Sequence, residues 1–371
     1  MTGHDAEPRI AIHSGWDLDD SRSWSGVITP LVQEIEERHT LRRLPGLDVR
    51  DALVDRARTR LSTRPVLPRH SKVTARRRSR ALRRLVVPAQ TDLLVTVAAS
   101  TDLVMRSETP VLQITDATFD AVAGFYPQFS GLSAESLRQG RWVERRSAAH
   151  TSHFLVASDW ACRSLVQEVG VHSERVTVAP FGPGIVPPDE LPPVRSSHDM
   201  LELLFVSSDW HRKNGDVALE VHASLNSQLP VRLTVVGDAP QLSHRPGVRT
   251  LGRVDPEQLS QLYLDSDALL EPSRANASGV VITDALAHGL PVLAAEVGGV
   301  PTLVRPGVGG WLIESESFVD DAVRILRAVD RRSLDALSCS AAADARERLS
   351  WRAWGRAFDQ AVDAALGLDG R

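Results

Sequence analysis

Residues 271–299 read EPSRANASGVVITDALAHGLPVLAAEVGG and decide the fold of the second half of the chain. Small and polar residues fill 273–279, and the apolar spacing that follows predicts a helix over 280–288. Gly289 and Pro291 stop that helix before a predicted strand at 292–295. The pattern is a strand end, a loop, a helix and a strand, which is the repeating unit of a parallel α/β sheet.

A loop of small residues that leads into a helix is an expected anion site. The first N–H groups of a helix have no partner inside it, and the helix dipole adds about half a positive charge there. We therefore expect Ala277, Ser278 and Gly279 to contact a phosphate. Asn276 in the loop and Asp284 in the helix can hydrogen-bond hydroxyl groups beside it. The stretch predicts a nucleotide-sugar site.

Length, charge and cysteine content indicate the broad class of the protein. A chain of 371 residues is long enough for two domains, and a net charge of −4 gives no general attraction to nucleic acid or membranes. Cys162 and Cys339 are too few for a disulfide framework, which favours a reducing compartment. The N-terminus has no signal-peptide pattern and no apolar run approaches about 18 residues, so we expect a cytoplasmic protein.

Apolar segments alternate with helical patterns along both halves of the chain. In the first half, strands are expected at 10–13, 93–98, 111–114, 154–157 and 176–179, with helices at 27–37 and 133–149 and a helix capped by Ser158 that runs to Val169. In the second half, strands are expected at 203–206, 232–236, 268–270 and 292–295, with helices at 216–225, 256–264 and 280–288. Such alternation predicts two doubly wound parallel sheets, each covered by helices on both faces.

A proline-rich segment separates the two halves. Residues 183–198 hold five prolines and little apolar periodicity, which is typical of a linker. We expect a first domain at 1–185, a linker at 186–198 and a second domain at 199–349, followed by a last helix within 350–371. Two Rossmann-like domains of this kind, facing each other across a cleft, would bind a ligand at the carboxyl ends of their strands.

Two adjacent cations follow the first predicted strand of the second domain. Arg212 and Lys213 lie in the segment DWHRKNG at 209–215. When a sugar–diphosphate bond breaks, negative charge grows on the bridging oxygen, and such cations stabilise it. An ordinary loop with two exposed cations is the alternative. The phosphate loop predicted in the same domain favours the catalytic interpretation.

The first domain contains two further candidate site residues, Asp116 and Gly26. Asp116 directly follows the strand at 111–114, where its carboxylate can stabilise a positively charged sugar or orient an acceptor. A role as a turn or N-cap aspartate is the alternative. Gly26 precedes a predicted helix, where the backbone can approach a phosphate or acceptor closely, although glycine is also a common turn residue.

The segment from Arg56 to Arg84 holds 11 arginines, one lysine and no acidic residue. It is either a solvated helix face or a surface that contacts an anionic lipid or acceptor, which would place the protein at the inner membrane face. Nucleic acid is not an expected partner, because no aromatic residue lies among these charges to stack on bases.

Metal and cofactor motifs are not found in the sequence. No spacing of His and Cys fits zinc, and the phosphate-binding Gly-x4-Gly-Lys pattern does not occur. Asp265 and Asp267 lie between a predicted helix and a buried strand, where capping explains them. We therefore expect no metal and no bound cofactor, with the nucleotide-diphosphate sugar acting as a co-substrate.

Together these segments resemble the family 4 retaining glycosyltransferases, also called group 1, which have the two-domain GT-B fold. The resemblance covers most of the chain. It rests on SWSG, TDATF, a helix carrying Glu144, FLVASDWACRSL, VAPFG, LLFVSSDWHRKNGDVALE, LTVVGDAP, PSRANASGVVITDALAHGLPVLAAEVGGVP and GGWLI. In that family the last helix usually crosses back onto the first domain, which the pattern at 351–366 suits.

The resemblance implies roles for residues of the second domain, and this chain departs from the family at several of them. The family's basic pair binds the donor diphosphate, which implies this role for Arg212 and Lys213, although the family's arginine often lies a few residues earlier, at Ser208. The family's loop and helix carry two glutamates, of which the first contacts the donor sugar and the second the ribose. This chain has Asn276 and Asp284 at those positions.

Positions 278, 279 and 116 can also be compared with the family's pattern. Ser278 replaces a usual phenylalanine, while Gly279 is kept. An acidic residue at the position of Asp116 occurs in relatives. The missing glutamates indicate either an unusual donor sugar or weakened transfer.

The leading hypothesis is a retaining, metal-independent glycosyltransferase. It would bind a nucleotide-diphosphate sugar in the second domain and an acceptor, either a natural product or a glycan, in the first. The alternative is a degenerate relative that binds a nucleotide sugar or a partner protein without efficient transfer. A different reaction on the same fold, such as epimerisation, is disfavoured by the order of the motifs.

Overall fold

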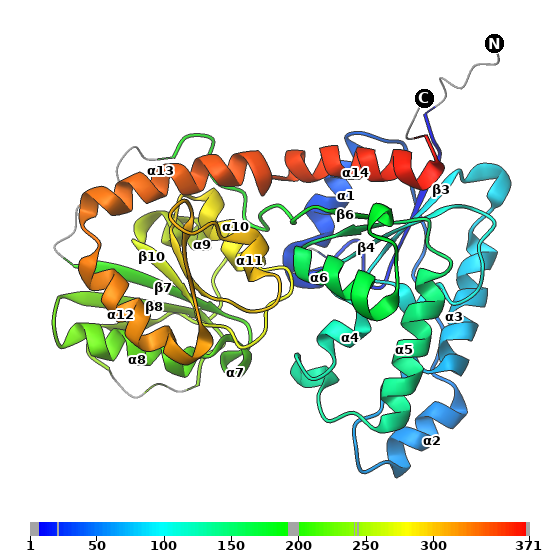
Figure 1. Cartoon of the computed structure of the whole chain (residues 1–371), viewed down its shortest axis with the longest axis horizontal. Helices are drawn as coiled ribbons and strands as arrows, with labels where there is room; N and C mark the ends of the chain where they lie inside the picture. The colour runs from blue at the N-terminus through cyan, green and yellow to red at the C-terminus, as the bar shows by residue number, and fades with distance from the viewer. Residues whose placement is uncertain (1–6, 21, 192–199, 241, 243–244, 369–371) are drawn as a thin grey trace. The chain divides into compact units, whose positions relative to one another are not determined.

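The computed structural model describes residues 7–20, 22–191, 200–240, 242 and 245–368 (Figure 1). The chain divides into two compact units: Met1–Ala179 with Trp354–Arg371, called unit 1, and Pro180–Ala353, called unit 2. Of the linker predicted at 186–198, residues 192–198 lie outside the described residues, and 186–191 belong to unit 2.

Unit 1 is built on a six-stranded parallel sheet with the order β2-β1-β3-β4-β5-β6. Every residue of β1, β3, β4 and β5 is buried, which agrees with the continuous apolar runs that predicted these strands. The strands are β1 Ile10–Ser14, β2 Leu41–Arg43, β3 Leu93–Val97, β4 Val111–Thr115, β5 His153–Val156 and β6 Val176–Val178.

Helices cover this sheet. They are α1 Ile28–Glu36, α2 Leu53–Leu61, α3 Lys72–Leu85, α4 Phe119–Val122, α5 Ala134–Ala148 and α6 Asp159–Ser164, which the π-helical turn Leu165–Val169 continues. Short 3-10 turns include η1 Ser23–Gly26, η2 Pro68–His70 and η4 Ser100–Asp102. The helix predicted at 27–37 starts at Ile28, and Trp24, Ser25 and Gly26 before it lie outside the helical region, with φ values of 50°, 60° and 85°.

Unit 2 contains a second six-stranded parallel sheet, with the order β12-β11-β10-β7-β8-β9. From β7 the sheet continues through β8 and β9 on one side and through β10, β11 and β12 on the other. This is the Rossmann order. The strands are β7 Leu201–Ser207, β8 Val231–Gly237, β9 Val248–Thr250, β10 Ala268–Glu271, β11 Val292–Ala295 and β12 Gly310–Ile313.

Two apolar layers cover the faces of this sheet (Figure 1). Leu203 and Phe205 of β7 pack with residues of α8 and α12, whereas Leu204 packs with residues of α10, α11 and α13. The helices are α7 Trp210–Lys213, α8 Gly215–Asn226, α9 Pro256–Asp265, α10 Val280–Ala287, α11 Val300–Leu303, α12 Phe318–Ala328 and α13 Arg331–Arg348. Alternate side chains of one strand therefore serve both layers.

The last helix, α14 Trp351–Leu366, packs on α1 of unit 1. Trp354 and Phe358 are buried, and Asp359 accepts bonds from Arg38 Nη1 at 2.7 Å and pairs with His39 Nε2 at 2.9 Å. Within the described part of the chain, no helix combines the length and apolar character needed to cross a membrane.

Candidate functional site

The order of strands in unit 2 reverses between β7 and β10. Their pairing covers Ala268 with Leu203 and Leu269 with Leu204, so the ends of the two strands beyond this point are not paired with each other. In open α/β sheets, ligands bind outside the carboxyl ends of the strands at such a reversal. The ends of β7 and β10 therefore mark the candidate site.

A buried ion pair lies at this reversal. Lys213, the last residue of α7, places Nζ 2.6 Å from Glu271 Oε1 at the end of β10, and their side chains are 6% and 0% exposed. Burial lowers the pKa of Lys213, and the negative charge of Glu271 opposes that shift. Glu271 Oε2 is buried and has no hydrogen-bond partner among the described residues. The site thus contains a cation whose counter-ion is a carboxylate of the protein itself.

The loop after β10 is hydrogen-bonded to Glu271 of this pair. Asn276 Nδ2 donates to Glu271 Oε1 at 3.0 Å, and Asn276 Oδ1 accepts a bond from the Gly279 N–H at 2.9 Å. Ser273 Oγ also donates to Glu271 Oε1. Gly279 has φ +59°, and a Cβ atom there would lie 2.3 Å from Leu303 Cδ1. This close left-handed turn explains why glycine precedes the helix.

The loop delivers the chain to the N-terminus of α10. Gly279 is the N-cap residue, with Ala277 buried and Ser278 half-buried directly before it. The first N–H groups of the helix have no partner within it, and the helix dipole makes this end attractive to anions. No acidic residue lies in the first turn to compete with a bound anion. Ala277, Ser278 and Gly279 directly precede the first turn of this helix, and their contact with a phosphate remains a prediction.

Arg212 joins the loop after β7 to the loop after β10. Its Nη1 donates to the Ala275 carbonyl at 3.1 Å, and its Nη2 donates to Ser208 Oγ at 3.2 Å. The Arg212 carbonyl accepts a bond from the Arg274 N–H at 2.8 Å. Its side chain is 16% exposed. Arg212 therefore lies at the same strand ends as the buried ion pair, with Ser208 beside it.

The Asp284 side chain forms hydrogen bonds to the backbone inside unit 2. Its Oδ1 accepts bonds from the N–H groups of Gly184 at 2.7 Å and Ile185 at 3.0 Å, and Tyr263 Oη lies 3.5 Å from Oδ2. Burial raises the pKa of Asp284 to about 7, although the two backbone N–H groups act to lower it. Asp284 thus holds the chain at 184–185 against α10. Its implied contact with ribose remains a prediction, and a direct contact would compete with these bonds.

Asp116 and Gly26 belong to unit 1. Asp116 is half-buried and directly follows β4, and Gly26 ends the left-handed run that follows β1. Consecutive left-handed residues are uncommon outside glycine and often mark functional loops. The catalytic role of Asp116 and the binding role of Gly26 remain predictions.

The described residues contain no group of three or more His, Cys, Asp or Glu that could hold a metal ion. The basic segment forms α2, η2 and α3, and its arginines accompany exposed apolar side chains. Leu53 and Leu61 of α2 are 79% and 84% exposed. A membrane or acceptor contact of this segment remains a prediction.

Comparison with known proteins agrees with this geometry. Residues 201–328 match the family described as glycosyl transferases group 1. The chain carries a group 1 glycosyltransferase domain. Relatives of this glycosyltransferase domain include the D-inositol 3-phosphate glycosyltransferase of Geodermatophilus obscurus, 30% identical over 60% of this chain and 54% of the relative. The sulfoquinovosyl transferase SQD2 of Arabidopsis thaliana is 32% identical over 37% of this chain and 29% of the relative. The chain therefore spans about half or less of the length of these relatives.

Solved glycosyltransferase structures share the fold along nearly the whole chain. Sucrose-phosphate synthase from Thermosynechococcus elongatus is similar with a TM-score of 0.70 and 17% identity, covering 98% of this chain and 100% of that one. HepE of Anabaena in complex with UDP and glucose has a TM-score of 0.62 and 15% identity, covering 96% and 99%. These similarities confirm the predicted GT-B fold, with two Rossmann-like domains.

Glu271, which lies beside Lys213 and Asn276 at the candidate site, is not among the site residues predicted from the sequence. A signal was present, because a glutamate directly follows the apolar run at 268–270 and a buried strand rarely ends in an unpaired charge. Its partner was not evident, because Lys213 is distant in sequence and meets Glu271 only through the adjacency of β7 and β10.

Proposed function

We propose that this chain is a retaining glycosyltransferase that moves a sugar from a nucleotide-diphosphate sugar to an acceptor hydroxyl. The observation that carries the proposal is the gathering of Arg212, the Lys213–Glu271 pair and the start of α10 at one reversal of strand order. Two cations and a helix N-terminus supply the charge that a departing diphosphate needs. The group 1 domain match over 201–328 supports the same conclusion.

In the proposed reaction, the bond between sugar C1 and the diphosphate oxygen breaks, and its electron pair stays on that oxygen. Arg212, Lys213 and the N–H groups of α10 stabilise the resulting charge, so a metal ion is not needed for this task. The acceptor oxygen then attacks C1 from the face that the diphosphate leaves, and its proton passes to a phosphate oxygen. Attack on that face retains the configuration at C1. Asp116 orients the acceptor or stabilises the positive sugar.

Glu271 supplies the carboxylate that the family's pattern places at position 276. Asn276 is engaged with Glu271 and Gly279, so it holds the loop in place. Glu271 Oε1 keeps Lys213 charged and oriented, while Oε2 has no hydrogen-bond partner among the described residues. We infer that Oε2 accepts a hydrogen bond from a hydroxyl of the donor sugar. The carboxylate is thus provided by the end of β10 instead of by the loop.

The nucleotide and the acceptor are narrower parts of the proposal. HepE of Anabaena forms complexes with UDP and with UDP-glucose, so a uridine diphosphate sugar is the first donor to test. The acceptor, a natural product or a glycan, would bind in unit 1. A peripheral membrane contact through Arg56 to Arg84 would bring a lipid-linked acceptor to that unit. Sedimentation with anionic and neutral vesicles measures that contact directly.

Sugar transfer from a panel of nucleotide sugars tests the function, with the configuration of the product determined by NMR. Arg212→Ala is expected to lower the rate by about a hundredfold, because one donor to the developing charge is lost. Lys213→Met combined with Glu271→Gln removes the pair without leaving a lone buried charge, and should also abolish efficient transfer. Arg274→Ala is the control, because Arg274 is exposed and its side chain contacts Asn214.

Two outcomes would change the assignment. Undiminished transfer by Arg212→Ala and by the double variant would remove these residues from the mechanism. Nucleotide binding without transfer to any acceptor would support the alternative of a degenerate, binding-only relative.

A further inference from the structure

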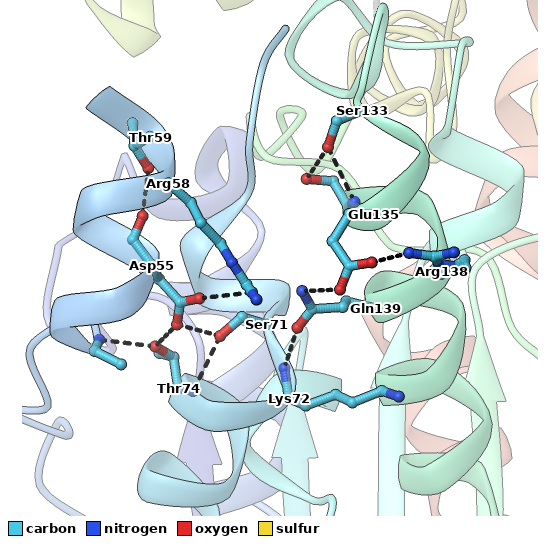
Figure 2. A network of polar contacts seen from close by, with 12 residues as sticks. Asp55, Arg58, Thr59, Ser71, Lys72, Thr74, Ser133, Glu135, Arg138 and Gln139 are labelled. Carbon is cyan, nitrogen blue, oxygen red and sulfur yellow. Dashed lines mark hydrogen bonds and ion pairs between the residues drawn. The ribbon is translucent and has the colours of Figure 1, made fainter. Parts of the chain in front are cut away.

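Unit 1 contains a cavity of about 350 Å³ between α2, the chain around η2 and the beginning of α5. Figure 2 shows its two sides, with Asp55 and Arg58 from α2 and Glu135 and Gln139 from α5. Its volume falls within the range of about 300–1,000 Å³ that is typical of small-molecule sites. None of the residues predicted to bind the donor lines it.

The helix that forms one wall is attached to the rest of unit 1 through a polar contact. Asp55 is the buried residue of α2, and its Oδ2 accepts a bond from Thr74 Oγ1 at 2.8 Å and another from Ser71 Oγ. A helix on a protein surface usually buries an apolar stripe against the core. Here Leu61, which lines the cavity, remains 84% exposed. The wall therefore presents apolar surface that the protein itself does not cover.

One atom of this wall lacks a hydrogen bond. Asp55 is 1% exposed, and its Oδ1 has no hydrogen-bond partner among the described residues. The nearest cation, Arg58 Nη1, lies 3.6 Å from Oδ1 and forms an ion pair without a hydrogen bond. A buried carboxylate oxygen without a hydrogen bond is costly, so a donor from a ligand would be favourable here.

The opposite wall limits the charge of such a ligand. Glu135, on α5, accepts a bond from Gln139 Nε2 at 2.8 Å and another from Arg138. Gln139 Oε1 in turn accepts a bond from the Lys72 N–H at 2.8 Å. Carboxylates from both walls thus border the cavity, which disfavours an anionic ligand. Leu61, Val66 and Leu67 add the apolar part of the lining.

We propose that this cavity binds a small, largely apolar molecule that donates a hydroxyl or amino hydrogen to Asp55 Oδ1. The apolar body of the molecule covers Leu61, Val66 and Leu67. The donor group completes the hydrogen bonding of Asp55. Asp55 and Glu135 disfavour a phosphorylated or carboxylated molecule, although Arg58 also lines the cavity.

The chain around η2, which lines this cavity, also contacts the carboxyl end of β1. Arg69, between cavity-lining Leu67 and Ser71, donates from Nη1 to the Gly15 carbonyl at 3.4 Å and from Nε to Thr101 Oγ1 at 3.2 Å. Gly15 directly follows β1, at the carboxyl end of the strands. This contact holds one side of the cavity near the carboxyl end of β1. An acceptor as the bound molecule is an identification that rests on the proposed transfer function, whereas the binding itself does not.

Three probes that share a cyclohexyl ring test the proposal on the full chain: cyclohexanol, protonated cyclohexylamine and cyclohexanecarboxylate. Binding is measured by ligand-observed NMR titration. The alcohol and the amine are expected to bind, and the carboxylate to bind at least about tenfold more weakly, a difference of about 1.4 kcal/mol. Asp55→Asn removes the negative charge and should weaken binding of the amine more than binding of the alcohol.

Because Asp55 also anchors α2, a second pair of variants keeps the test independent of folding. Ser62→Trp fills the cavity from its rim and should abolish binding of both probes, whereas Leu53→Trp places the same indole side chain on α2 outside the cavity lining and should not. Absence of alcohol and amine binding, or equal binding by the two tryptophan variants, would overturn the proposal. UDP binding in the same sample tests the donor site separately, so probe binding without UDP binding rejects only the transfer function.

Discussion

The ammonium group of Lys213 and the carboxylate of Glu271 lie 2.6 Å apart, and both side chains are buried. Removing one member of such a pair leaves the other as an uncompensated buried charge, which is costly. Glu271→Gln is expected to lower the free energy of unfolding by about 3 kcal/mol. Bound UDP would place negative charge near Lys213 again, so UDP should raise the melting temperature of Glu271→Gln more than that of the wild type.

Thermal unfolding with and without UDP measures this difference. Glu220→Gln on α8 is the matched control, because Glu220 is exposed and loses the same charge. Equal UDP-induced shifts in Glu271→Gln and the wild type would separate the ion pair from the nucleotide site.

The raised pKa of Asp284 predicts that the free energy of unfolding depends on pH. Its pKa is about 7 in the folded protein, against about 3.9 for an aspartate in an unfolded chain. Because the folded value is the higher, the contribution of Asp284 to stability is complete below about pH 4 and is lost as the pH rises through 7. Asp284→Asn keeps an acceptor for the Gly184 and Ile185 N–H groups and removes the titration. Between pH 5 and 8, the wild type should lose roughly 2 kcal/mol more than the variant.

Urea unfolding at the two pH values provides the measurement. Asp265→Asn, at the exposed end of α9, is the control and should keep the wild-type loss. If Asp284→Asn lost as much stability as the wild type, the carboxylate would already be ionised in the folded protein at pH 5.

Among the elements, the loop before α10 depends on a left-handed glycine. Gly279→Ala must accommodate a Cβ atom 2.3 Å from Leu303 Cδ1 and a φ of +59°, so it should lose more than the about 1–2 kcal/mol that a left-handed conformation alone costs. The displaced helix start should also bind UDP more weakly. Gly124→Ala provides the comparison, because Gly124 has φ +82° but an added Cβ meets nothing within 4 Å.

Calorimetric titration of UDP and thermal unfolding separate the two effects. The difference in stability between the two variants reports the steric contact, and the difference in affinity reports the α10 N-terminus. Unchanged UDP affinity in Gly279→Ala would argue against phosphate binding at this helix.

Edge strands show which elements sequence patterns miss. The central strands of both sheets and the edge strand β6 were predicted from apolar runs, whereas the other edge strands, β2, β9 and β12, were not. β2 and β9 contain no buried residue, because an edge strand has a neighbour on one side alone. Their pairing depends on the strand beside them more than on their own apolar pattern.

At the scale of the whole molecule, the residues proposed to bind the donor lie in one compact unit, apart from Gly26. Ser208, Arg212, Lys213, Glu271 and Asn276 all belong to unit 2, so UDP is expected to protect that unit. Hydrogen exchange of the full chain is expected to slow at 208–215 and 272–283 when UDP binds, with little change in the strands of unit 1. Equal protection of both units would indicate that the nucleotide contacts unit 1 as strongly.

The sequence by itself determined the alternation of strands and helices, the glycine-bearing loop before α10 and the basic pair at 212–213, because each depends on residues close together in the chain. Tertiary structure alone decided that Glu271 neutralises Lys213, that Asp284 holds the backbone at 184–185, and that a cavity forms beside Asp55. These contacts join residues distant in sequence. They exist only after non-consecutive strands pair and helices pack, and no local pattern encodes which partner a buried charge will meet.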